Sequence, residues 1–155
     1  MKITSIAQLF PQIREVVLTN YLTGEEFVVS MRDLMPSELV VIDSTLKQPE
    51  PPIKTFKNGA PVFDDKDPKY RREREEADQE YVYRWILAAW QVEYPEGIET
   101  PEQKLEVLKN PKTGIPYWAF NEFARRLREA TGLSMSDVAL AKKNFRMMNS
   151  ENQST

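Results

Sequence analysis

Two apolar runs near the start of the chain have the character of β-strands. Residues 15–19 read EVVLT and residues 26–32 read EFVVSMR, and both runs are rich in β-branched side chains. The segment between them, NYLTGE, places Gly24 where a turn needs a glycine. The pattern therefore predicts a β-hairpin, preceded by one short helical turn within residues 3–10.

The next apolar positions follow helical spacing. Pro36 suits the first position of a short helix that we expect to reach about Leu46. Asp67 is a good N-cap and Pro68 a good first residue for a long helix, and this helix can continue to about Glu93 before the Tyr94-Pro95 pair stops it.

The C-terminal third contains three further helix signals. Thr100 and Gln103 form a capping box that opens a short helix to Lys109. A helix is expected from about Tyr117 to Ala130, closed by a glycine at position 132. Spacings of three and four predict a last helix that starts near residue 134 or 136 and ends near 148.

Strands come first and helices follow, which predicts an α+β fold that is mostly helical: an N-terminal β-hairpin, a long central helix and a C-terminal helical bundle. The length favours a single domain over residues 1–148. A proline-rich arm at about 47–67 contains a turn signal at 57–60, and this signal predicts a small second hairpin. Residues 149–155 form a polar tail.

The second half of the long helix is apolar on two faces. Each of the two apolar stripes needs a surface that packs on it and shields it from water. The hairpin and the C-terminal helices of the same domain can supply both. Alternatively, a partner or a second copy covers part of the second stripe. The first stripe, expected in the core, is Tyr81, Trp85, Ala88 and Val92; the second is Tyr83, Ile86, Leu87, Trp90 and Tyr94.

Four aromatic residues are candidates for protein binding, because tryptophan and tyrosine are the usual anchors of protein interfaces. Tyr83, Trp90 and Tyr94 belong to the second stripe of the long helix. Trp118 falls off the apolar stripe of its own helix and is expected at the rim of the core.

Composition narrows the chemistry. The chain contains no Cys and no His, so thiol nucleophiles, zinc-thiolate sites and histidine acid/base catalysis are excluded. The acidic cluster FDDKDP lacks the alternating ligands and central glycine of a calcium loop. No phosphate-binding glycine motif is present. We therefore expect a non-enzymatic binding or assembly protein that uses no cofactor and no metal.

Charge and hydropathy restrict the partners further. The net charge of -3 argues against a protein that mainly neutralises phosphates. No apolar stretch approaches the roughly 18 residues of a membrane span. We expect no nucleic-acid partner, no membrane and a cytoplasmic location.

Three stretches together resemble the tail assembly chaperones of long-tailed, siphovirus-type bacteriophages. They are the hairpin leading into MRDLMPSELVVID, the helix in FDDKDPKYRREREEADQEYVYRWILAAW, and the ending LREATGLSMSDVALAKKNFR. The Asp67-Pro68 helix opener, the segment EGIETPEQKLEVL and a Lys-aromatic-Arg ending, within residues 143–146, carry the resemblance. It covers roughly residues 14–148, and the arm from 48 to 61 has no counterpart.

The resemblance implies a protein that coats the long tape measure protein in the host cytoplasm. It implies that tail tube protein later displaces the chaperone, which helps to recruit the tube subunits, is a weak homo-oligomer and is absent from the finished virion. An apolar tape measure chain would aggregate if bare, so its chaperone must offer apolar and aromatic grooves.

Two other functions remain open from the sequence. One is a small structural protein of the virion, such as a head-to-tail connector or a tail completion protein. The other is a regulatory module that binds nucleic acid through a basic set on the last two predicted helices, although no helix-turn-helix pattern accompanies it. That set is Arg125, Arg126, Arg128 and the basic residues at positions 142, 143 and 146.

Overall fold

A computed structural model describes residues 2–8, 13–55 and 59–131. The chain divides into two compact units: Met1–Thr45 with Tyr81–Leu127, and Leu46–Glu80 with Arg128–Thr155. The fold is α+β and mostly helical with an N-terminal two-stranded hairpin, as the sequence predicts. The single domain expected over 1–148 stays a prediction.

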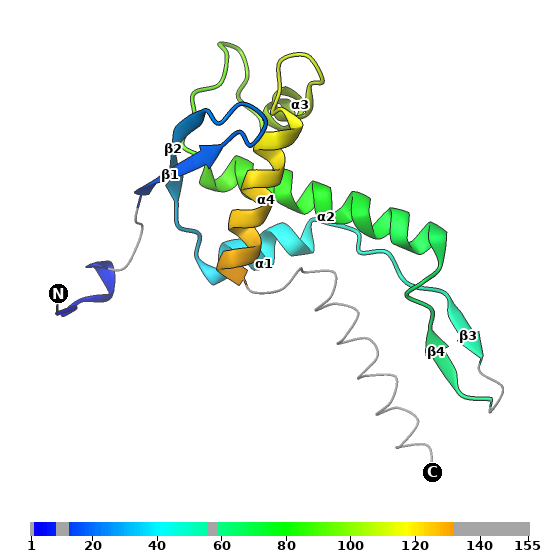
Figure 1. Cartoon of the computed structure of the whole chain (residues 1–155). Coiled ribbons are helices and arrows are strands. Elements are labelled where there is room, and N and C mark those ends of the chain that lie inside the picture. The colour runs from blue at the N-terminus through cyan, green and yellow to red at the C-terminus, as the bar shows by residue number, and fades with distance from the viewer. Residues whose placement is uncertain (1, 9–12, 56–58, 132–155) are drawn as a thin grey trace. The chain divides into compact units, whose positions relative to one another are not determined.

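The first unit contains the longer hairpin and most of the helical packing (Figure 1). The long helix α2 (Pro68–Ala89) contributes its second half to this unit, and α4 (Tyr117–Thr131) contributes all but its last turn. The remaining elements of the unit are the 3-10 turn η1 (Ile6–Gln8), β1 (Ile13–Thr19), β2 (Glu26–Arg32), α1 (Pro36–Ser44) and α3 (Pro101–Lys109).

Strands β1 and β2 form the predicted antiparallel hairpin. Their register runs from Ile13 opposite Arg32 to Thr19 opposite Glu26. Gly24 has a φ of 75°, a value that L side chains rarely adopt, and this explains the glycine in the turn. The hairpin begins two residues earlier than the sequence pattern suggests.

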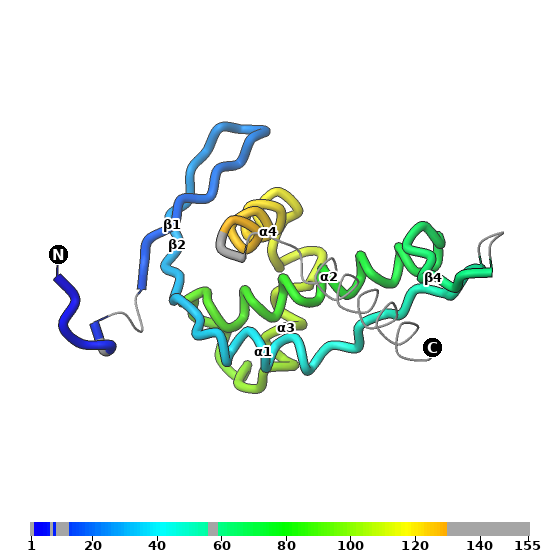
Figure 2. Tube along the Cα trace, turned by 90° about the horizontal axis from the view of Figure 1, so that it is seen from below, coloured from blue at the N-terminus to red at the C-terminus, as the bar shows by residue number. Residues whose placement is uncertain are grey.

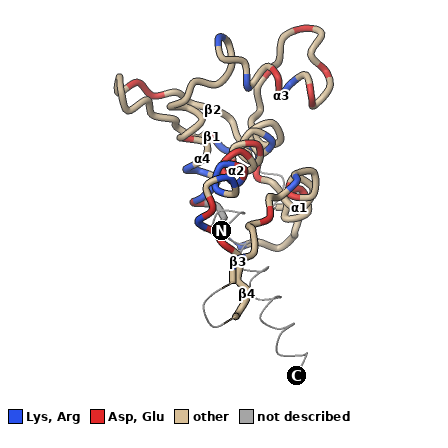
Figure 3. The backbone as a smooth tube through the Cα atoms, turned by 90° about the vertical axis from the view of Figure 1, so that its right-hand side faces the viewer, with Lys and Arg blue, Asp and Glu red and all other residues tan. Residues whose placement is uncertain are grey.

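The second unit contains a smaller hairpin and the charged half of α2. β3 (Ile53–Thr55) pairs with β4 (Pro61–Phe63) in antiparallel register. The Asp67 carboxylate accepts a hydrogen bond of 2.9 Å from the Tyr70 amide, which confirms Asp67 as the cap of α2. Basic and acidic residues are interspersed along α2 (Figure 3), and the chain here alternates between the two signs.

Helix α2 ends at Ala89 rather than near Glu93, so the predicted end was wrong. Trp90 forms an isolated antiparallel bridge with Met31 of β2. The amide of the next residue, Gln91, donates to the Ser30 carbonyl at 2.8 Å. Pairing with a strand therefore ends the helix before Tyr94-Pro95 can.

The other predicted helices within the described ranges are confirmed. In α3 the Thr100 hydroxyl accepts from the Gln103 amide at 3.2 Å, and the Gln103 side chain accepts from the Thr100 amide at 3.1 Å. α1 ends two residues before the predicted Leu46. The predicted glycine cap at position 132 and the last helix lie outside the described residues.

The core of the first unit forms where α4 lies against the second half of α2 (Figures 1 and 2). Ring contacts connect the two helices: Tyr83 with Phe120 at 4.8 Å between centroids and Trp85 with Phe123 at 6.5 Å. None of the helices in the described ranges could span a lipid bilayer. The most buried hydrophobic side chains here are Leu18, Tyr81, Ile86, Ala89, Leu108, Phe123 and Ala124.

The division of α2 into a core stripe and a partner stripe was wrong in part. Ile86, which the sequence places on the second stripe, is fully buried. Trp85, expected in the core, is only half-buried. The buried residues of this half of the helix combine members of both expected stripes with residues of neither: they are Tyr81, Val82, Ile86 and Ala89.

Candidate functional site

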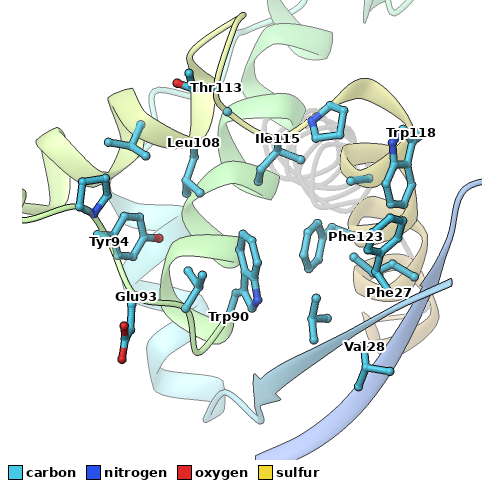
Figure 4. A pocket seen from close by; sticks show the side chains of 18 residues that line it. Phe27, Val28, Trp90, Glu93, Tyr94, Leu108, Thr113, Ile115, Trp118 and Phe123 are labelled. Atoms are coloured by element: carbon cyan, nitrogen blue, oxygen red, sulfur yellow. The ribbon is translucent and has the colours of Figure 1, made fainter. Parts of the chain in front are cut away.

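A pocket of about 350 Å³ opens in the first unit, and its walls are almost entirely apolar (Figure 4). Three segments supply them: the hairpin, the stretch after α2, and the chain from the end of α3 into α4. The lining residues are Leu18, Phe27, Val28, Val29, Trp90, Val92, Glu93, Tyr94, Pro95, Val107, Leu108, Thr113, Gly114, Ile115, Pro116, Trp118, Ala119 and Phe123.

The first wall forms just after α2, where the chain pairs briefly with β2 and then turns away from it. Trp90 pairs with Met31 in the bridge, and its ring lies 5.5 Å from that of Phe123. The Val92 amide then donates to the Trp90 carbonyl at 3.1 Å, a tight turn that directs the chain away from the strand. The pocket opens between β2 and this departing segment.

The loop between α3 and α4 forms the second wall. The Asn110 side-chain oxygen accepts hydrogen bonds from the amides of Lys112 at 2.9 Å and Thr113 at 3.3 Å, which folds the loop back. The Ile115 amide donates to the Leu108 carbonyl at 3.0 Å. Gly114 is required at this close approach, because a Cβ there would clash with the backbone of Leu108 and Asn110. The loop thus directs Ile115 and Pro116 into the pocket.

Helix α4 is held against β1 by a buried carboxylate. Glu122 accepts from the Thr19 amide at 3.2 Å and forms an ion pair with Arg125 at 3.1 Å, with its side chain 3% exposed. These bonds lower the pKa of Glu122, the contact with Arg125 most strongly, and outweigh the opposing effect of burial. One turn later, Arg126 donates to the Val17 carbonyl at 3.2 Å. The two contacts fix the hairpin relative to the pocket floor.

Tyr94 places a polar group among the apolar walls. Its hydroxyl is buried and has no hydrogen-bond partner among the described residues. Burial raises the pKa of Tyr94, so the phenol stays neutral near pH 7. The Lys104 ammonium lies 5.3 Å from the centroid of the ring. In Figure 4 the hydroxyl points inward, while the Glu93 carboxylate points away from the centre of the pocket.

The structure brings together three of the four aromatic residues predicted to bind protein. Trp90, Tyr94 and Trp118 all line the pocket. Trp118 was expected at the rim of the core; it is half-buried, and its ring packs 5.3 Å from that of Phe27 in β2. Tyr83 lies elsewhere: it packs against Phe120, and the Lys109 ammonium lies 5.5 Å from its ring centroid.

Sequence reasoning missed most of the remaining wall. Phe27 is one aromatic residue in a strand. The side of the sheet on which its side chain lies cannot be known until the register of the hairpin is known. Ile115 lies in the loop NPKTGIP, where an apolar residue flanked by glycine and proline was the available signal. Phe123 lies in a predicted helix, but its contacts with Trp85 and Trp90 depend on how that helix packs.

The pocket is suited to binding apolar groups. Among the described residues, Glu93 is the only charged one that lines it, and this part of the chain contains no group of three or more acidic side chains placed to hold a metal. Arg125 and Arg126, from the basic set considered for nucleic acid, bond to Glu122 and to the Val17 carbonyl. The predicted absence of catalysis and cofactors stays a prediction.

No family model, curated protein or solved structure matches the chain.

Proposed function

We propose that the chain is a non-enzymatic tail assembly chaperone of a long-tailed bacteriophage. It binds apolar side chains of the tape measure protein in the pocket, keeps that protein soluble in the host cytoplasm and gives way to tail tube protein. The observation that supports this most is the pocket itself, where Trp90, Tyr94 and Trp118 converge from two separate segments on one apolar cavity.

The size and lining of the pocket suit this task. Its volume of about 350 Å³ lies at the lower end of the roughly 300–1,000 Å³ typical of ligand sites. A cavity of this size accepts a large side chain rather than a folded domain. Each contact is therefore weak, but many copies along one long chain give high overall occupancy.

The resemblance in sequence supports the choice of partner. The stretches that carry it include the β1–β2 hairpin and the stretch that ends at Trp90, and both contribute residues to the pocket lining. The resemblance thus connects the segments that build the cavity with a family whose task is to cover an apolar chain.

Co-expression with the tape measure protein of the same phage tests the proposal. The wild-type chain is expected to increase the soluble fraction of that protein. Trp118→Ala should weaken binding by about 2 kcal/mol or more, as aromatic anchors do, while the fold is kept. Tyr117→Ala is the matched control, because Tyr117 is 80% exposed and is not part of the pocket lining.

Two outcomes would contradict the proposal. One is a tape measure protein that stays insoluble with the wild-type chain and does not bind it. The other is the presence of the chain in purified virions in fixed proportion to tail proteins, which would favour a connector or tail completion protein.

A further inference from the structure

Among the residues that the structure describes, a short stretch of the outer edge of β2 has no backbone hydrogen-bond partner. In an antiparallel pair of strands, the amide and the carbonyl of one residue point in the same direction. Successive residues direct them alternately toward and away from the neighbouring strand. The Ser30 carbonyl points away from β1, because it accepts from the Gln91 amide on the opposite side. Because the direction alternates from one residue to the next, Val28 and Glu26 also direct their amides and carbonyls away from β1.

The outer edge of β1 independently indicates the same alternation of inward and outward backbone groups. Val17 and Thr19 stand opposite Val28 and Glu26 in the register. The Val17 carbonyl and the Thr19 amide bond to side chains of α4, so both residues direct these groups away from β2. Residues opposite one another share this property, and the outward direction at Val28 follows again.

The described residues cover only one end of this edge. Trp90 and Gln91 pair with β2 at Met31 and Ser30, and the turn at Val92 then directs the chain away. Val28 is 63% exposed. Within the described ranges, its outward amide and carbonyl have no hydrogen-bond partner. An unpaired strand edge is a template for another extended chain.

The pocket lies beside this free edge. Phe27, Val28 and Val29 of β2 all contribute to its lining, as do Val92 and Tyr94 of the departing segment. A strand added to β2 projects alternate side chains to opposite faces, so one face of such a strand points into the cavity. The buried Tyr94 hydroxyl is available as a donor to a carbonyl that enters there.

Acidic side chains lie at both ends of the free edge. Glu25 and Glu26 lie at the hairpin turn, and Glu93 lines the pocket. Among the described residues these three carboxylates form no ion pair. Acidic positions are visible at the hairpin turn and around α3 in Figure 3. A segment flanked by lysine or arginine therefore has the complementary charge.

We propose that an extended segment of the partner protein adds to β2 as a third strand along Glu26–Val28. Its apolar side chain enters the pocket, and a flanking lysine or arginine lies near Glu93. The inference rests on the proposed function in taking the occupant to be a segment of the tape measure protein. It specifies more: the bound segment is extended, alternates apolar and polar residues, and has basic ends.

A synthetic peptide of this chemistry tests the site on the whole chain. The probe is acetyl-Lys-Val-Thr-Leu-Thr-Val-Lys-amide, and the fluorescence of the two pocket tryptophans, Trp90 and Trp118, reports its binding. Two peptides of the same sequence, each N-methylated at alternate residues in opposite phase, cover both sets of backbone amides. Strand addition predicts at least tenfold weaker binding for one phase of methylation and a much smaller loss for the other. Equal binding of all three peptides would overturn the inference.

A pair of proline variants tests the edge itself. Val28→Pro removes an outward amide and leaves the β1–β2 ladder intact, so the variant should melt near the wild type but bind the peptide at least tenfold more weakly. Val29→Pro is the matched control, because the Val29 amide points toward β1 and its loss breaks the hairpin. If the two variants melt at the same temperature, the assignment of which β2 amides point away from β1 is wrong.

A charge variant tests the choice of flanking residues. Glu93→Lys should weaken binding of the lysine-flanked peptide several-fold and strengthen binding of a glutamate-flanked version of the same sequence. If this exchange leaves both affinities unchanged, the basic-end requirement is overturned.

The results separate this inference from the proposed function. If Val28→Pro loses the peptide but still solubilises the tape measure protein, strand addition is overturned as its binding mode and the chaperone function stands. If the wild-type chain binds the peptide without any effect on the tape measure protein, the proposed function falls and the peptide site remains. If no peptide binds at millimolar concentration, but the chain self-associates or takes only small apolar molecules, the inference is overturned in favour of those occupants.

Discussion

The two hairpins of the chain differ in what supports them. β1–β2 extends over seven residues in each strand, buries Leu18 and Met31, and bonds on its outer edges to α4 and to Gln91. β3–β4 has three residues in each strand, and every residue of β3 is exposed. An isolated pair of strands is marginally stable in water. The longer hairpin is thus fixed by its neighbours, and it is the one that can carry a binding site.

Truncating an apolar side chain in each hairpin should give the largest difference. Leu18 is 3% exposed, so Leu18→Ala should lower the free energy of unfolding by about 2–5 kcal/mol. Val62→Ala in half-buried β4 should cost less than about 1 kcal/mol. Urea unfolding of both variants measures the two costs. Equal costs would show that the hairpins share the same degree of support.

The attachment of β1 to α4 should give a smaller and pH-dependent effect. Glu122→Gln keeps the shape of the side chain but removes its charge, so we expect a loss of about 1–3 kcal/mol at pH 7. The folded state lowers the pKa of Glu122. Its stabilisation is therefore present above the unfolded value of about 4.3 and is lost as the pH falls through the folded value.

Stability curves between pH 7 and pH 3 check this effect. The wild type should lose more stability on acidification than Glu122→Gln does. The variant keeps the loss due to Glu38, whose pKa the bidentate contact with Arg32 lowers. Parallel curves for the two proteins would show that the Glu122 contacts do not support the hairpin.

The sequence predicts those parts of the fold that depend on local chemistry. The Thr100–Gln103 capping box, the Asp67 cap and the turn at Gly24 are each decided by a few adjacent residues, and all three are confirmed. The end of α2 could not be predicted in the same way. Trp90 leaves the helix because it pairs with Met31, a residue 59 positions earlier in the chain.

The pocket shows the same limit. Trp90 and Tyr94 were predicted as anchors because they are aromatic residues on the second apolar stripe of the long helix. The place of Trp118 depends on its contact with Phe27, which requires the register of the hairpin and the folded loop at Gly114 together. A site built from three separate segments has no continuous signature in the sequence.

Photo-crosslinking inside the pocket tests most directly whether the cavity holds the tape measure protein. Benzoylphenylalanine in place of Trp118 samples the cavity, and the same group in place of Ile53, which is 63% exposed on β3 and does not line the pocket, serves as the comparison. After co-expression and irradiation, a crosslink to an alternating apolar segment with basic ends is expected at position 118 and none at position 53. Equal crosslinking at both positions, or none at 118 while the two proteins remain in complex, would contradict the account.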